Sequence, residues 1–164
     1  MPFTPFHVGP GLLLKSAAPR RLSVTAFALA NVAIDVETLY HLTRQEFPLH
    51  RWAHTVPFAT LIGIATGAAY GAIARRFSLS AGNSDLAAES RLMPAIVGGF
   101  LGGVTHPLLD GLVHGDVRPF WPLSDANPLF GLISNTAVVT LCLFAGIAGF
   151  FVLAVRLARQ NQRQ

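Results

Sequence analysis

Two histidines separated by four positions stand in residues 50–55 (HRWAHT). On a helix, side chains at i and i+4 share one face, so His50 and His54 could bind a single metal ion. The alternative is an interfacial segment in which His50 is solvated and Trp52 lies at the membrane surface. This pair alone leaves both interpretations open.

A second set repeats the same spacing, with His106, Asp110 and His114. Each step of four turns a helix by about 40°, so the three side chains lie on one broad face. A histidine and a carboxylate inside an apolar stretch are costly unless they are paired, metal-bound or hydrated. The set therefore predicts either a metal site or a His–Asp hydrogen bond that only holds helices together.

Asp35 and Glu37 interrupt another apolar run. They point about 200° apart on a helix, so one helix cannot direct both at a single ion. We expect Asp35 to be the ligand and Glu37 to be either a second ligand or a general base, with His41 orienting it. His7 would lie on the same side of the membrane, which favours a role at the same site.

The composition of the chain indicates what kind of protein must position these residues. Of 164 residues, 52% are hydrophobic and 12% are charged, against about a quarter charged in soluble domains. The mean hydropathy is +0.50. These values exclude a disordered chain and an ordinary soluble enzyme, and favour an integral membrane protein.

Four apolar runs reach the roughly 20 residues that a transmembrane helix needs. They cover residues 22–42, 53–74, 92–113 and 128–157. A fifth run, residues 7–18, is about 18 Å long as a helix and is a short span, a re-entrant half-helix or an interfacial helix. We therefore predict one all-α membrane domain over residues 1–164, a polytopic bundle of four long transmembrane helices plus one short N-terminal span or half-span.

The cations orient this bundle. If the runs alternate in direction, nine of the twelve Lys and Arg residues fall on one side, which by the positive-inside rule is the cytoplasm. These nine are Lys15, Arg20, Arg21, Arg75, Arg76, Arg91, Arg156, Arg159 and Arg163. The C-terminus is then cytoplasmic, and all six histidines fall toward the outer side. Because the cations are scattered around apolar runs, no nucleic-acid partner is expected despite a pI of 10.2.

Small residues predict close packing of these helices. Gly63, Gly67 and Gly71 are spaced by four, as are Gly99 and Gly103, and such spacing lets membrane helices approach closely. The alternative is that glycine is simply common in such helices. The single cysteine, Cys142, excludes an internal disulfide and a cysteine-based zinc site.

The candidate ligands are imidazole nitrogens and carboxylate oxygens without thiolate, a set that suits one or two ions of zinc, manganese or iron. Such ions activate water for hydrolysis and bind phosphoryl oxygens. The chain has no nucleophile elbow, Walker loop or dinucleotide fingerprint. These observations favour metal chemistry, with zinc as the first choice of cofactor.

The order of these motifs resembles the YdjM-like family of small bacterial inner-membrane proteins. The resemblance runs from Phe3 to about Ser134 and implies a metal-dependent hydrolase of the inner membrane. Carried over by position, the family pattern implies the metal ligands His7, Asp35, His50, His54, His106 and Asp110. The chain departs from the pattern at residues 33–37 (AIDVE), where the family often has Pro-Asp-x-Asp, and at Ala53, where it often has threonine.

We therefore expect a membrane-embedded hydrolase that takes a phosphoester or lipid-like amphiphile from the outer leaflet of the bilayer. Glu37 or Asp116 would be the base, and Arg51 or Arg118 would bind an anionic oxygen. His114 would contact the substrate.

Two alternatives are a non-catalytic metal-binding scaffold or partner-binding regulator, and a structural network of polar groups. Transport is disfavoured, because the inner halves of the apolar runs contain no acids.

Overall fold

The computed structural model describes residues 4–77 and 87–162, and every regular element in these ranges is a helix. The elements are α1 (Thr4–Ala17), α2 (Val24–Thr43), the short 3-10 helix η1 (Trp52–His54), α3 (Val56–Arg76), the 3-10 helix η2 (Ala87–Ser90), α4 (Leu92–Val113) and α5 (Asn135–Asn161). The prediction of an all-α fold is confirmed for the described residues. Arg163, used above to orient the chain, lies outside them.

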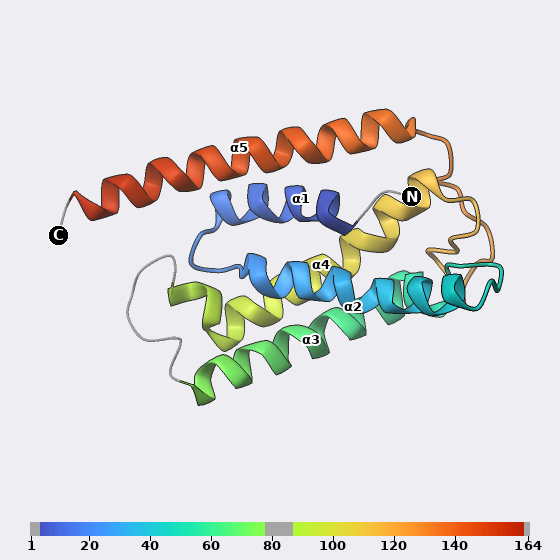
Figure 1. Ribbon diagram of the computed structural model, residues 1–164, viewed down its shortest axis with the longest axis horizontal. Coiled ribbons are helices and arrows are strands. Elements are labelled where there is room, and N and C mark those ends of the chain that lie inside the picture. The colour runs from blue at the N-terminus through green and yellow to red at the C-terminus, as the bar shows by residue number, and fades with distance from the viewer. Residues whose placement is uncertain (1–3, 78–86, 163–164) are drawn as a thin grey trace.

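The helices lie side by side along the long axis of the molecule (Figure 1). α5 forms one edge and packs chiefly on α1, while α3 forms the opposite edge and packs on α4. α2 contacts α1, α3 and α4. Because successive helices alternate in direction, the start of α1, the ends of α2 and α4 and the start of α3 meet at one end (Figure 1).

Within the described residues, three helices, α3, α4 and α5, are long and apolar enough to cross a membrane. The prediction of four long transmembrane helices is therefore wrong. α2 has 20 residues, but Asn31, Asp35 and Glu37 interrupt its apolar character. α1 has 14 residues, or about 21 Å of helix, which is shorter than the hydrocarbon core of about 30 Å.

The last helix also begins later than predicted, at Asn135 instead of residue 128. Ser134 is its N-cap, and the Ser134 hydroxyl accepts a hydrogen bond of 3.2 Å from the Ala137 amide. Before it, Gly131 has a φ of +78°, which a helix does not allow. α4, by contrast, has the bounds expected of it.

The helices α3 and α4 pack with their backbones in contact. A methyl group added at Gly63 would collide with the Gly99 carbonyl oxygen, and one at Gly99 would collide with the Gly63 carbonyl oxygen. The two backbones therefore touch where glycine removes the side chains, as the spacing of small residues predicts. This contact brings the start of α3 against the end of α4.

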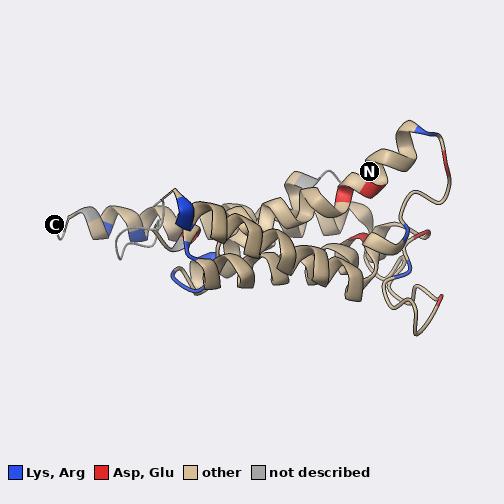
Figure 2. Cartoon of the chain, turned by 90° about the horizontal axis from the view of Figure 1, so that it is seen from below, with Lys and Arg blue, Asp and Glu red and all other residues tan. Residues whose placement is uncertain are grey.

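Charge is distributed unevenly along the bundle. Most Lys and Arg residues lie toward the end that carries the C-terminus, and most Asp and Glu residues lie toward the other end (Figure 2). Glu89 is an exception, because it lies toward the C-terminal end. Its negative charge is balanced there by the Lys15 ammonium, which lies 2.6 Å from the Glu89 carboxylate. The opposite end therefore holds an excess of carboxylates together with the histidines.

Candidate metal centre

Four side chains from three elements meet at the acidic end of the bundle. Asp35 comes from α2, His54 from η1, and His106 and Asp110 from α4. One ligand atom from each lies within 4.8 Å of the others. His54 and His106 are fully buried, and Asp110 is 3% exposed. We call these four residues the inner group.

The separations within the inner group fit a single ion. His106 Nε2 lies 3.3 Å from His54 Nε2, 3.2 Å from Asp35 Oδ1 and 3.3 Å from Asp110 Oδ2. His54 Nε2 lies 3.5 Å from Asp35 Oδ1 and 3.6 Å from Asp110 Oδ2. Four ligands placed tetrahedrally at bonds of about 2.0–2.1 Å are about 3.3–3.4 Å apart. The observed donors therefore need little movement to hold an ion.

Asn31 sets the hydrogen position on His106. The Asn31 amide nitrogen donates to the Phe27 carbonyl at 2.7 Å, so the Asn31 oxygen faces His106 Nδ1 at 2.8 Å. Nδ1 must then carry the hydrogen and donate it. His106 Nε2 is left with a free lone pair that points at the other three ligands, as metal-binding histidines require.

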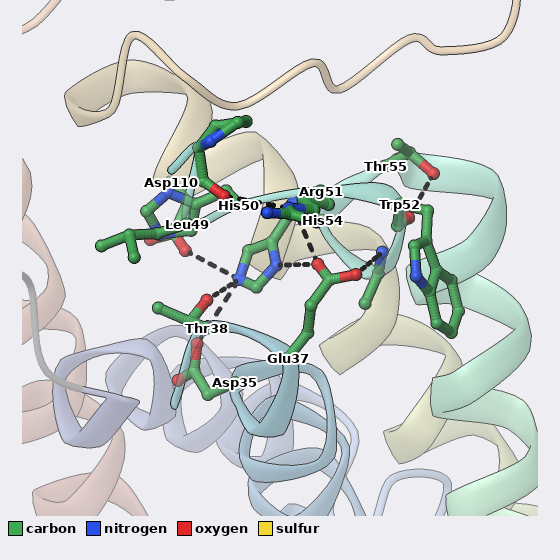
Figure 3. A network of polar contacts seen from close by, with 12 residues as sticks. Asp35, Glu37, Thr38, Leu49, His50, Arg51, Trp52, His54, Thr55 and Asp110 are labelled. Carbon is green, nitrogen blue, oxygen red and sulfur yellow. Dashed lines mark hydrogen bonds and ion pairs between the residues drawn. The ribbon is translucent and has the colours of Figure 1, made fainter. Parts of the chain in front are cut away.

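Glu37 orients His54 from the side away from the other ligands (Figure 3). Its carboxylate lies 3.3 Å from His54 Nδ1 and accepts hydrogen bonds from the Arg51 and Ala53 amides at 3.0 and 3.1 Å. Burial alone lowers the pKa of His54, but the carboxylates of Asp35 and Glu37 outweigh burial and raise this pKa above its ordinary value.

His7 closes the inner group from α1. Its Nε2 lies 3.3 Å from Asp110 Oδ1, and its ring packs on the His106 ring at 4.6 Å between centroids. Apart from that ion-pair contact, His7 Nδ1 and Asp110 Oδ1 are buried polar atoms without a hydrogen-bond partner among the described residues. Buried polar atoms are ordinarily satisfied, so these orphaned atoms beside converging ligands fit a place built for a bound ion.

A second set of ligands, His50, His114 and Asp116, forms an outer group. His50 Nδ1 lies 3.0 Å from both Asp116 carboxylate oxygens. Burial opposes ionisation of Asp116, but His50 outweighs it and lowers the pKa of this carboxyl. The His50 ring packs on the His114 ring at 4.5 Å and on the His54 ring at 4.7 Å, so the two groups are neighbours.

A pocket of about 620 Å³ lies beside the outer group. Its lining includes two cations, two tryptophans and one ligand of the outer group, namely Arg51, Arg118, Trp52, Trp121 and His50. The arginines pair with exposed acids, Arg51 with Glu46 at 3.4 Å and Arg118 with Asp125 at 2.8 Å. Such exposed pairs are weak, so an anionic ligand could replace them.

The model of the YdjM inner membrane protein family matches residues 4–164, nearly the whole chain. The chain belongs to this family. No curated protein and no solved structure matches the chain. Family membership together with three apolar helices identifies a membrane protein with a His/Asp cluster.

The structure of this YdjM-family protein divides the six predicted metal ligands. Four of them form the inner group, His7 touches Asp110 from behind, and His50 belongs to the outer group. His50 and His54 do not share a helix face, as their i, i+4 spacing predicted, because η1 begins at Trp52 and His50 lies before it. The rings still meet, through the loop fold instead of a shared helix face.

The remaining predicted residues also lie at this end of the YdjM-family bundle. Glu37 contacts η1 and His54, and Asp116 and His114 belong to the outer group. Arg51 and Arg118 line the pocket. Their roles as base and as substrate contacts stay predictions.

Sequence reasoning missed two residues of α2, Asn31 and Thr38. Thr38 Oγ1 lies 3.3 Å from His54 Nε2 (Figure 3). Asn31 precedes Asp35 by four positions and Thr38 follows it by three, so all three share one helix face. A polar stripe along an apolar helix was the signal that could have found them.

Proposed function

We propose that this protein is a multi-pass membrane hydrolase that depends on a divalent metal ion held by the inner group. The observation that carries the proposal is the convergence of four ligand atoms on one point. Two neutral imidazoles and two carboxylates balance the charge of a divalent cation. Nitrogen and oxygen donors without thiolate favour zinc, with manganese or iron as alternatives.

An ion bound there supplies activation of water and polarisation of a phosphoryl or carbonyl oxygen. The chain's own residues prepare for that chemistry. Asn31 and Glu37 hold the two histidines in the tautomer that leaves each Nε2 free. Since Glu37 is occupied by two backbone amides and His54, we assign it to positioning. Asp116 stays ionised, as a proton acceptor or a cation ligand must be.

The pocket indicates an amphiphilic phosphoester as the substrate. Arg51 and Arg118 could contact phosphate oxygens, while Trp52 and Trp121 suit the interface between headgroups and acyl chains. By the positive-inside rule, this end of the bundle would lie outside and the C-terminus in the cytoplasm. A substrate would then enter from the headgroup region of the outer leaflet.

One observation favours a second candidate, a non-catalytic metal-binding membrane protein. Structural metal sites are closed by four protein ligands, whereas catalytic sites keep an open position. Three residues of the inner group are buried. Asp35, whose side chain is 28% exposed, is where solvent approaches the group.

The test combines metal content with hydrolysis. Detergent-purified wild type, His54→Ala and Asp110→Asn would be compared by elemental analysis and by hydrolysis of bis(p-nitrophenyl) phosphate and of phosphatidic acid in vesicles. The matched control is His41→Ala, a histidine of the same end that pairs with Glu46. We expect bound metal and hydrolysis in wild type and control, and less bound metal together with loss of hydrolysis in the two variants.

Metal without hydrolysis would support the scaffold. Absence of metal from every protein, together with unchanged thermal stability in the variants, would reduce the cluster to a structural network and contradict the proposal.

A further inference from the structure

We propose that the outer group, His50, His114 and Asp116, binds a second divalent transition-metal ion, so that the centre is dinuclear. The inference deepens the proposed function, on which it rests for its chemistry. The inner group has four protein ligands, as structural metal sites do, and a second ion with open positions would supply the place for water and substrate.

The outer group joins two segments far apart in the sequence. His50 stands in the loop before η1, His114 is the C-cap residue of α4, and Asp116 follows two positions later. One ligand atom from each lies within 4.8 Å of the others. His50 is 7% exposed. Two imidazoles and one carboxylate leave coordination positions open, which is the composition of catalytic sites.

Asp116 is held in place by more than His50. Its Oδ2 accepts hydrogen bonds from the Leu49 and His50 amides at 3.1 and 3.2 Å. These two bonds already attach the loop to the segment after α4. His114 is therefore not needed to hold the Asp116 carboxylate in place. Asp116 Oδ1 lies 3.0 Å from His50 Nδ1, within the group whose ligand atoms converge.

His114 has no structural task that would explain its position. Among the described residues, its ring packs on the His50 ring and its ring nitrogens make no hydrogen bond. The backbone around His114 is fixed, because the side-chain amide of Asn127 donates to the carbonyls of Gly111 and His114 at 3.0 Å each. A rigidly held imidazole with unused nitrogens beside a carboxylate is suited to bind a cation.

The helix end favours a cation as well. The aligned peptide dipoles of α4 give its C-terminus a partial negative charge, and both groups lie at that end. The contact of the His50 ring with the His54 ring places the groups next to each other. His50 also lines the pocket with the two arginines, so the open site faces the proposed substrate. Paired ions stabilise both the attacking and the leaving oxygen of a phosphoester.

The experiment counts ions with Zn²⁺ alone as the probe. Full-length protein in detergent would be stripped with a chelator, reloaded with Zn²⁺, desalted and analysed for zinc per chain. We expect two equivalents in wild type, one in His114→Ala and one in Asp116→Asn. Asp110→Asn, which damages the inner group, should keep one. The control Asp125→Asn, an exposed acid of the same loop that pairs with Arg118, should keep two.

A second measurement can be decided on the wild-type protein, so it does not require that a variant folds. Reloading wild type with Mn²⁺ should produce the electron paramagnetic resonance spectrum of two coupled ions, and His114→Gln should produce that of an isolated ion. One equivalent of zinc in wild type, or an uncoupled manganese spectrum, would overturn the inference. So would two equivalents in a folded His114→Ala protein.

Failure of the proposed function has a different signature. Two bound ions without hydrolysis would sustain the dinuclear centre and reject the hydrolase. A wild-type protein that binds one ion and hydrolyses substrate would support the hydrolase and reject the dinuclear centre. In that case hydrolysis would be lost in Asp110→Asn and kept in His114→Ala.

Discussion

At the scale of residues, three of the four candidate ligands of the inner group contact a supporting side chain. Asn31 supports His106, Glu37 supports His54, and His7 lies against Asp110. Partners of this kind typically change metal affinity by about 10–100-fold when they are removed. The metal affinity of the centre should therefore depend on Glu37, although Glu37 lies outside both ligand groups.

We expect Glu37→Gln to weaken Zn²⁺ binding by about 10–100-fold near neutral pH and to change its pH dependence. The proton and the metal compete for His54, whose pKa the carboxylates raise above the ordinary value of about 6.5. Affinity in wild type should therefore fall as pH falls through that raised pKa. Without the Glu37 charge the pKa of His54 drops, so the decline should begin at a lower pH.

The measurement is Zn²⁺ affinity by competition with a chromophoric chelator across the pH range in which the protein stays folded. Glu46→Gln is the control, because Glu46 pairs with His41 at 2.9 Å and touches neither group. Superimposable curves for Glu37→Gln and wild type would show that Glu37 does not act through His54.

At the scale of elements, the site depends on how closely α3 and α4 pack. η1 and the start of α3 carry His54 toward the end of α4, which carries His106 and Asp110. The glycine contact between Gly63 and Gly99 brings these helices together at backbone distance. Any side chain at this contact separates the helices and, with them, the two halves of the inner group.

We expect Gly63→Ala to lower the free energy of unfolding by about 1–3 kcal/mol, the range for overpacked interiors. The sign is diagnostic, because glycine to alanine in a helix without such a contact is stabilising by about 1 kcal/mol. Thermal unfolding in detergent would measure it. The control is Ala69→Leu at an exposed position of α3, which should change stability little. A Gly63→Ala protein as stable as wild type would contradict the packing described.

At the scale of the whole molecule, charge and apolar surface together define an orientation. The exposed face of α5 includes Phe144, Ile147 and Phe150, each exposed by at least 65%, as expected of a surface that contacts lipid. Cations collect toward the C-terminal end and acids toward the other (Figure 2). By the positive-inside rule we therefore expect the candidate centre to lie on the outer side.

We expect a cysteine placed at the centre's end to react with a membrane-impermeant maleimide in intact cells. Leu123 is 95% exposed at that end and Phe77 is 70% exposed at the opposite end, so Leu123→Cys and Phe77→Cys form a matched pair. The native Cys142 is 4% exposed and should contribute little background. Leu123→Cys should be labelled directly and Phe77→Cys only after permeabilisation. The reverse pattern would invert the orientation.

The helical class and the His and Asp composition of the cluster were predictable from the sequence, because run length and composition act locally. The same is true of α4, whose apolar run predicts its bounds. α2 was misjudged because its run is long enough, yet its polar stripe faces ligands inside the bundle. The start of α5 was misjudged because a serine cap and a positive φ override hydropathy.

What the sequence by itself determined is the set of residue types that could bind metal and the end of the bundle where they lie. Only the tertiary structure decided which of them share a site. His50 and His54 are four apart in sequence but belong to different groups, because the chain between them forms a loop and a 3-10 turn. Asn31 lies 75 positions from the histidine it orients. Such pairings arise from the packing of helices against each other, which no local spacing encodes.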